Sequence, residues 1–259
     1  MYLKNKKIVI TRTQPGAGRL AILCRQLGAK PIIFPTIEIM PCVLNQQLQQ
    51  NLTRLQYVDK IIFFSPNAVK QCVVLCQQYQ LPIPQHVEFF AVGQSTAEVL
   101  QQQWQCQVHY PQPSFDSESL LAMPQLANVN GQIIVIVAGV GGRELLEQEL
   151  TTRGAKVQKL SLYQRVCARS RPQPLLLAWE QDEIAIIVTT SIDGLKNLFT
   201  IVGEQGKAYL LQTPLLVISD RMQQQAISLG YQAALIIKAT SAQDYDIMNT
   251  LKNYFGEWL

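Results

Sequence analysis

KIVITRTQPGAGRLAILCRQLGAK, residues 7–30, aligns without a gap with IIVIVAGVGGRELLEQELTTRGAK, residues 133–156. Each stretch holds an apolar run, a polar turn, an amphipathic segment and the triplet Gly-Ala-Lys. That order is typical of a β-strand followed by a helix and the start of the next strand. Gly28 stands opposite Gly154, 126 residues further along the chain.

The same spacing recurs in two later pairs of segments. Ser65 in IIFFSPNAV stands opposite Ser191 in IIVTTSIDGL, and Val92 stands opposite Ile218. One spacing held over three segments predicts an internal duplication of two α/β units. The alternative is that all βα units look alike, and the shared triplet and the constant spacing argue against it.

Short apolar runs alternate with amphipathic stretches along the whole chain. Runs that are apolar on both faces and separated by helices predict parallel sheets covered by helices. Two such units suggest two lobes with a cleft between them, the usual place for a small-molecule site. The expected strands are Lys7–Thr11, Pro31–Phe34, Lys60–Ser65, Glu88–Val92, Gln105–Tyr110, Ile133–Ala138, Lys156–Leu162, Glu183–Thr190, Leu215–Ser219 and Ala233–Lys238.

Ligands of parallel sheets bind beyond the carboxyl ends of the strands, so the turns that follow the strands are the candidate site. Helix N-termini present free N–H groups that attract carboxylates and phosphates. Ser65, Thr96 and Ser191 are expected at helix starts, where capping of the helix is the competing structural explanation. The turns concerned are Thr11–Thr13, Ser65–Asn67, Gly93–Thr96, Gly139–Arg143, Thr189–Ser191 and Ser219–Arg221.

The composition excludes several classes of protein. With 48% hydrophobic and 15% charged residues, the chain can bury a core and is not disordered. The net charge of +4 is too small to indicate a nucleic-acid binder. Seven of the basic residues fall within residues 1–40 beside a single acid, which indicates either a border of an anion site or a solvated face. No apolar stretch is long enough to span a membrane.

The cysteines, histidines and glycines limit which kinds of functional site the chain can contain. Six cysteines without a C-x-x-C pattern, in a chain without a leader, predict reduced and mostly buried thiols and a cytoplasmic location. Two scattered histidines argue against a metal site or a Ser-His-Asp triad. Gly139-Val140-Gly141 is expected to follow a strand and open a helix, but Glu144 stands where a dinucleotide fingerprint needs its third glycine.

The turn motifs resemble those of the uroporphyrinogen-III synthase family over nearly the whole chain. FFSPNAV is similar to the family's "TSPNAV" and FAVGQSTAEVL to its "AVGxxTAxxL". IVIVAGVGGRELLEQELTTRGAKVQKLSLYQRV resembles "RGxGGRExLxxxLxxRGAxVxxxxxYxRV", and VTTSIDGLKNL resembles "TSxxGLxxL". The chain departs from the pattern at Ala138, where the family often has Arg, and at Ser219–Met222, where many members read "GxxT".

The resemblance implies two α/β lobes of flavodoxin-like or Rossmann-like type, joined by two antiparallel linker strands. Ile37 and Tyr163 are 126 residues apart, so the two crossings occupy equivalent positions in the repeat. The implied boundaries are residues 1–36 with 170–259 for the first lobe, 42–162 for the second, and 37–41 and 163–169 for the linkers.

The resemblance also implies an activity. Hydroxymethylbilane, a linear tetrapyrrole with eight carboxylates, is closed to uroporphyrinogen III with loss of water and inversion of ring D. No cofactor or metal, no nucleic acid and no membrane is implied. The implied partners are the small-molecule substrate and, in transient contact, the preceding enzyme of the pathway, and the implied oligomeric state is a monomer.

Site residues are implied at the matching positions. Tyr163, at the second linker and facing the cleft, would donate a hydrogen bond to the departing hydroxyl; its alternative role is packing. Because the substrate supplies most of the driving force, binding contributions are expected to be diffuse. The implied substrate-binding residues are Thr11, Arg12, Ser65, Asn67, Thr96, Gly141, Arg143, Thr190 and Ser191.

Two other classes of protein stay open at this point. A non-catalytic two-lobed protein that binds a small polyanionic ligand shares hinged α/β lobes. A nucleotide-dependent enzyme is the third reading, and the broken glycine fingerprint weakens it.

Overall fold

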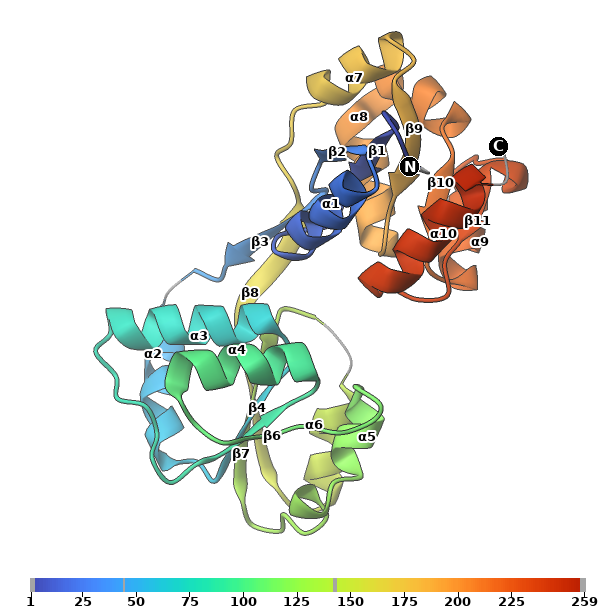
Figure 1. Cartoon of the computed structure of the whole chain (residues 1–259). Coiled ribbons are helices and arrows are strands. Elements are labelled where there is room, and N and C mark those ends of the chain that lie inside the picture. Colours follow the sequence, from blue (N-terminus) through green and yellow to red (C-terminus); the bar gives the residue numbers. More distant parts are fainter. Residues whose placement is uncertain (1–2, 44, 142–143, 257–259) are drawn as a thin grey trace. The chain divides into compact units, whose positions relative to one another are not determined.

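A computed structural model of the chain describes residues 3–43, 45–141 and 144–256. Strands and helices alternate, and the chain divides into two compact units (Figure 1). Unit 1 comprises Met1–Glu38 and Val166–Leu259, and unit 2 comprises Ile39–Arg165. Both division points lie within the segments that were expected as linkers.

Unit 2 is built on a parallel sheet in the order β8-β7-β4-β5-β6, with β3 beside β8. Helices and short 3₁₀ turns connect the strands. The strands are β3 (Ile37–Pro41), β4 (Lys60–Phe63), β5 (Glu88–Ala91), β6 (Val108–His109), β7 (Ile133–Gly139) and β8 (Lys156–Cys167). The helices are α2 (Gln46–Thr53), α3 (Pro66–Gln78), α4 (Gln94–Trp104), α5 (Ser117–Leu121) and α6 (Leu145–Thr152), with 3₁₀ turns at Arg54–Tyr57 and Pro124–Leu126.

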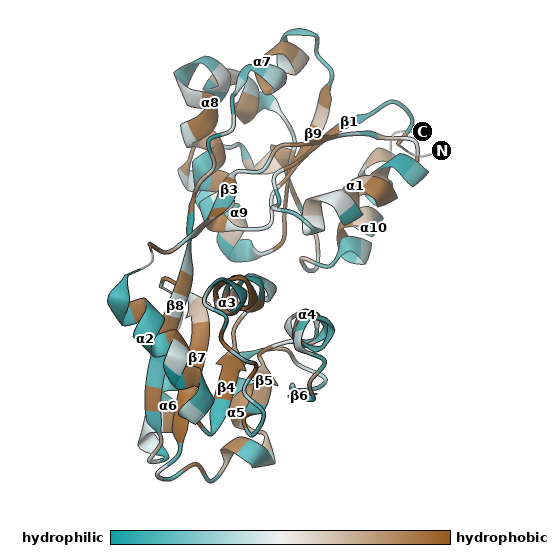
Figure 2. Ribbon diagram, turned by 90° about the vertical axis from the view of Figure 1, so that its left-hand side faces the viewer, coloured by the Kyte–Doolittle hydropathy of each residue, from teal (hydrophilic) through white to brown (hydrophobic). Residues whose placement is uncertain are grey.

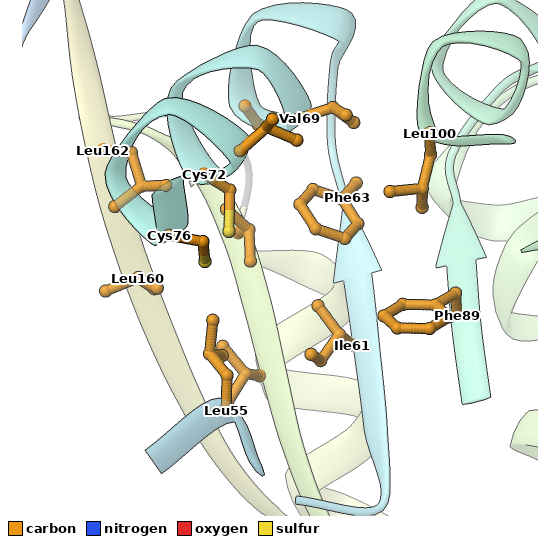
Figure 3. Close-up of a cluster of buried hydrophobic side chains, with 14 of the residues drawn as sticks. Leu55, Ile61, Phe63, Val69, Cys72, Cys76, Phe89, Leu100, Leu160 and Leu162 are labelled. Atoms are coloured by element: carbon orange, nitrogen blue, oxygen red, sulfur yellow. The ribbon is translucent and has the colours of Figure 1, made fainter. Parts of the chain in front are cut away.

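Alternating residues of each strand face two different layers of helices. Ile61 and Phe63 of β4 belong to the cluster with α3 and α4, whereas Ile62 belongs to the cluster with α5 and α6. Successive side chains of a strand point to opposite faces, so a strand covered on both faces is apolar throughout. Figure 3 shows the first cluster, with Val69 and Cys72 of α3 directed towards the sheet.

Unit 1 carries a five-stranded parallel sheet in the order β11-β10-β9-β1-β2. One cluster packs α1 and α10 against it, and the other packs α7, α8 and α9. The strands are β1 (Lys7–Ile10), β2 (Lys30–Ile33), β9 (Ile184–Val188), β10 (Leu215–Val217) and β11 (Ile236–Lys238). The helices are α1 (Gly16–Gln26), α7 (Gln173–Glu180), α8 (Ile192–Gln212), α9 (Asp220–Ser228) and α10 (Asp244–Gly256), with a 3₁₀ turn at Ala233–Leu235.

The two sheets have the same strand order when elements 126 residues apart are matched, so the predicted structural repeat is confirmed. The matching turns agree in detail. Gly28 and Gly154 have φ of +89° and +86°, a conformation that favours glycine, and each follows a helix that it ends. The residues that follow these glycines make equivalent hydrogen bonds. Ala29 N–H donates to the Cys24 carbonyl, and Ala155 N–H donates to the Leu150 carbonyl.

Most predicted strands are present, and several of them end one or two residues early, whereas the strands that begin at Ile133 and Lys156 continue to Gly139 and Cys167. The last predicted residues of the shortened strands, such as Ser65 and Ser219, instead cap the helix that follows. The predicted strand Gln105–Tyr110 shortens to Val108–His109, and Ala233–Leu235 forms a 3₁₀ turn. The apolar pattern did not reveal β3, because its residues are only half-buried or exposed.

The distribution of apolar residues follows this architecture. Figure 2 shows apolar strands such as β4 and β7 beside helices of mixed polarity. Within the described ranges, no helix is long and apolar enough to cross a membrane. All six cysteines are free thiols, but only Cys24, Cys72 and Cys76 are buried. The expectation of mostly buried thiols is wrong for Cys167, which is exposed at the end of β8.

Candidate functional site

The carboxyl edge of the unit 2 sheet begins with Ser65, the N-cap of α3. Its Oγ accepts the Ala68 N–H at 3.1 Å, and Pro66 occupies the first helical position. This local sequence is favourable for a helix start, because the serine satisfies a free N–H and proline has none to satisfy. The capping role expected for Ser65 is confirmed.

Strand register brings Ser65 level with Tyr163. Phe63 of β4 pairs with Val137 of β7, and Gly139 pairs with Tyr163 of β8. Two residues beyond Phe63, Ser65 therefore reaches the same level of the sheet as Gly139 and Tyr163. The Ser65 Oγ and the Tyr163 hydroxyl oxygen are hydrogen-bonded at 2.9 Å.

The ring of Tyr163 lies over Gly139. A Cβ at Gly139 would stand 2.7 Å from Tyr163 Cζ, closer than atoms can approach without displacement. The strand ladder also shifts its register between Ala138 and Gly139, where the Tyr163 carbonyl accepts the Val140 N–H. The absence of a side chain at Gly139 is therefore what permits the aromatic ring to occupy this place.

Tyr163 is buried rather than open to solvent. Its side chain is only 3% exposed and belongs to the apolar core of unit 2. The ring closes over Gly139 and its hydroxyl group bonds to Ser65. The expectation that Tyr163 faces a cleft between the lobes stays a prediction. Tyr163 thus packs in the core and makes one hydrogen bond within the protein, whereas its expected hydrogen bond to the departing hydroxyl stays a prediction.

Two other predicted residues lie at the same edge, on helices α3 and α4. Asn67 occupies the first turn of α3 and is half-buried. The N-cap of α4 is Gly93, so the expectation that Thr96 caps this helix is wrong. Thr96 instead lies within the first turn, 3% exposed, and its N–H donates to the Gly93 carbonyl.

The glycine-rich turn after β7 does not open a helix directly. Gly141 has φ of +78°, and α6 begins only at Leu145 with Glu144 at its N-cap. The expectation that Gly139-Val140-Gly141 opens a helix is therefore wrong. Arg143, predicted to bind substrate, lies outside the described residues.

In unit 1, Ser191 repeats the arrangement at Ser65. Its Oγ accepts the Gly194 N–H at 3.0 Å at the start of α8, and Thr190 beside it is half-buried. Ser219 caps α9 in the same way, through the Met222 N–H at 3.3 Å. Each unit thus presents capped helix N-termini at the carboxyl edge of its sheet, an arrangement that favours anions.

The remaining predicted residues, Thr11 and Arg12, have partners within unit 1. The Thr11 hydroxyl donates to the Val188 carbonyl at 3.0 Å, and the side chain is buried. The Arg12 guanidinium pairs with Asp244 and donates to the Ala242 carbonyl, and it thereby holds the start of α10. Helix α1 begins only at Gly16, so this turn does not form a helix N-terminus.

The sequence alone did not indicate that Gly139 lies under Tyr163 or that Asp244 is the partner of Arg12. A signal existed for Gly139, a glycine at the end of an apolar run. None existed for Asp244, which is 232 residues from Arg12. In the described part of the chain, no group of three or more His, Cys, Asp or Glu side chains is arranged to hold a metal ion.

Comparisons with known proteins agree with this architecture. A family model described as uroporphyrinogen-III synthase HemD matches residues 18–244. The uroporphyrinogen-III synthase of Escherichia coli K12 is 32% identical over 93% of this chain and 97% of that protein. The Salmonella typhimurium enzyme of the same name is 31% identical over the same shares.

Two solved structures share the two-unit α/β fold. One is the uroporphyrinogen-III synthetase of Helicobacter pylori, with a TM-score of 0.59 and 13% identity. The other is a mutant uroporphyrinogen III synthase of Thermus thermophilus, with a TM-score of 0.58 and 16% identity. Each covers 98% of this chain and 100% of its own. With the family model matching most of its length, the chain belongs to the uroporphyrinogen-III synthase family.

Proposed function

We propose that this chain closes hydroxymethylbilane to uroporphyrinogen III, with loss of water and inversion of ring D. A lyase of tetrapyrrole biosynthesis is the activity that the family and its named relatives carry. The observation on which the proposal rests is the match to the Escherichia coli relative over 93% of this chain. The rival reading, a binding protein without catalysis, has no comparable support.

The negative charge of the substrate is complementary to the partial positive charge of the helix N-termini. A linear tetrapyrrole with eight carboxylates needs many anion contacts, and capped helix N-termini supply backbone N–H groups with partial positive charge. Ser65 and Gly93 begin such helices in unit 2, and Ser191 and Ser219 do so in unit 1. We assign Asn67, Gly141 and Thr190, which adjoin these edges, to substrate contacts, and Arg12 to supporting α10.

Tyr163 is the residue that we assign to the chemical step. The electron-rich pyrrole expels hydroxide and becomes an electrophilic azafulvene cation, and a hydrogen bond to the leaving oxygen assists this step. The phenol hydroxyl can donate that bond, and Ser65 holds it at a defined level of the sheet. In this assignment the tyrosine leaves Ser65 as it turns towards substrate, so Ser65 is a positioning residue.

Substitutions at Ser65 and Thr96 are expected to cost little. Ser65→Ala and Thr96→Val should each lower kcat/KM about tenfold or less, because contributions to substrate binding are spread over many contacts. Ser65→Ala should also destabilise the protein by about 1 kcal/mol through loss of the α3 cap. Steady-state kinetics and urea unfolding measure the two effects. A thousandfold loss at one position would contradict diffuse binding.

The product isomer tests the function itself. Purified protein is supplied with hydroxymethylbilane, and the uroporphyrinogen isomers are separated by chromatography after oxidation. We expect isomer III well above the spontaneous isomer I that a heat-denatured sample produces. If the native protein yields isomer I alone, the proposed function is wrong.

The setting of the reaction is proposed on chemical grounds. Six free thiols fit a reducing compartment such as the cytoplasm, where we place the reaction. We further propose that the chain acts as a monomer and meets the preceding enzyme of the pathway transiently, which would shorten the free lifetime of its unstable substrate.

A further inference from the structure

A polar groove of about 550 Å³ lies in unit 1 between α8 and α9. Helix α8 contributes Asp193 and Lys196 to its lining, and α9 contributes Arg221, Gln224 and Gln225. The two helices pack side by side, and both begin at the carboxyl edge of the sheet (Figure 1). Of these five residues, only Arg221 lies in a turn that the sequence indicated as a candidate site, and none is among the substrate-binding residues that the resemblance implies.

The cations of the groove are not used by the protein. Among the residues that the structure describes, neither Lys196 nor Arg221 has a carboxylate oxygen within 4.0 Å. Asp220 immediately precedes Arg221, but its carboxylate is paired with Lys238 at 2.5 Å. Among the described residues, the groove therefore presents to solvent two cations that form no ion pair.

The fixed charges around Lys196 and Arg221 also favour binding of an anion. Ser191 and Ser219 cap α8 and α9, so the partial positive charge of both helix N-termini adds to that of Lys196 and Arg221. The single opposing charge in the lining is the exposed carboxylate of Asp193. Gln224 and Gln225 add amide donors, which orient an acceptor without adding charge.

We infer that this groove binds a carboxylate side chain of the tetrapyrrole, with Arg221 and Lys196 as its ionic partners. The inference rests on the proposed function for the identity of the ligand. A guanidinium fits a carboxylate with two parallel hydrogen bonds, and the ammonium of Lys196 supplies a second point charge. The groove starts one residue after Thr190–Ser191, so a substrate held by that turn extends into it.

Binding of uroporphyrin III, the stable oxidised porphyrin with the same eight carboxylates, tests the groove directly. Its fluorescence is titrated with wild type, Lys196→Gln, Arg221→Gln and Asp193→Asn. Each loss of a cation should raise Kd about fivefold, the size expected for a partly exposed charged hydrogen bond. Asp193→Asn should lower Kd about twofold by removing the opposing charge. The KM for hydroxymethylbilane should change in the same directions, with kcat unchanged.

Arg25→Gln is the matched control, since it removes one exposed cation from the last turn of α1, outside the groove. Equal losses in Arg25→Gln and Arg221→Gln would overturn the inference, because only overall charge would then matter. Wild-type Kd in both Lys196→Gln and Arg221→Gln would also overturn it. Thermal unfolding verifies that each variant is folded.

The assay separates this inference from the proposed function. If the wild type forms isomer III but the groove variants bind uroporphyrin III normally, the groove inference fails and the function stands. If the wild type forms only isomer I while the cations still control the binding of uroporphyrin III, the function fails and the groove stands as a polycarboxylate site.

Discussion

Tyr163→Phe is expected to lower kcat about 10- to 100-fold, at or below the lower end of the effects for a lost general acid. The substitution removes the hydroxyl group that bonds to Ser65 and leaves the aromatic ring, which fills its place over Gly139. The protein should therefore stay folded and lose about 1 kcal/mol of unfolding free energy, the usual value of one hydrogen bond. Single-turnover formation of isomer III and urea unfolding give the two quantities.

Tyr110→Phe is the control for this change. Tyr110 is half-buried in the same unit, and its hydroxyl group accepts a hydrogen bond from Gln112 at 3.2 Å. Like Tyr163→Phe, the control therefore removes one hydroxyl group that has one hydrogen-bond partner. We expect wild-type kcat for this variant. Wild-type turnover by Tyr163→Phe would remove Tyr163 from the mechanism and leave it as a packing residue of the unit 2 core.

Gly139→Ala is expected to reduce activity at least as much as Tyr163→Phe does. The new methyl group would stand 2.7 Å from Tyr163 Cζ and 3.1 Å from the hydroxyl oxygen. The ring must move away, and this displacement takes the hydroxyl group from the place where it would meet the substrate. Crowding of this kind costs about 1–3 kcal/mol in stability, which chemical unfolding measures.

A double-variant comparison isolates the cause of that loss. In a Tyr163→Ala background the ring is absent, so Gly139→Ala should cost far less stability than in the wild type. Equal costs in the two backgrounds would show that contact with the ring is not responsible. Gly16→Ala serves as the control glycine, because its Cβ would meet only Arg12 Cδ at 3.9 Å, and we expect it to be neutral.

Several features of the site could be predicted from sequence because their causes are local. Ser65 and Ser191 cap the helices they precede, since a serine side chain reaches an N–H three residues on. Thr96 was misassigned as a cap because α4 starts earlier, at Gln94 after Gly93. Propensity places a helix start only to within a few residues, and here a glycine takes the cap position.

The sequence by itself determined the repeat of 126 residues, the parallel α/β class and the helix starts at Ser65 and Ser191, because side-chain periodicity and capping act over a few residues. Only the tertiary structure decided that Tyr163 meets Ser65 and that Arg12 meets Asp244, pairs 98 and 232 residues apart. Contacts at that separation depend on the register of β4, β7 and β8 and on the packing of α10 against α1. Register and packing are set by the whole sheet and its covering helices, so no short segment encodes them.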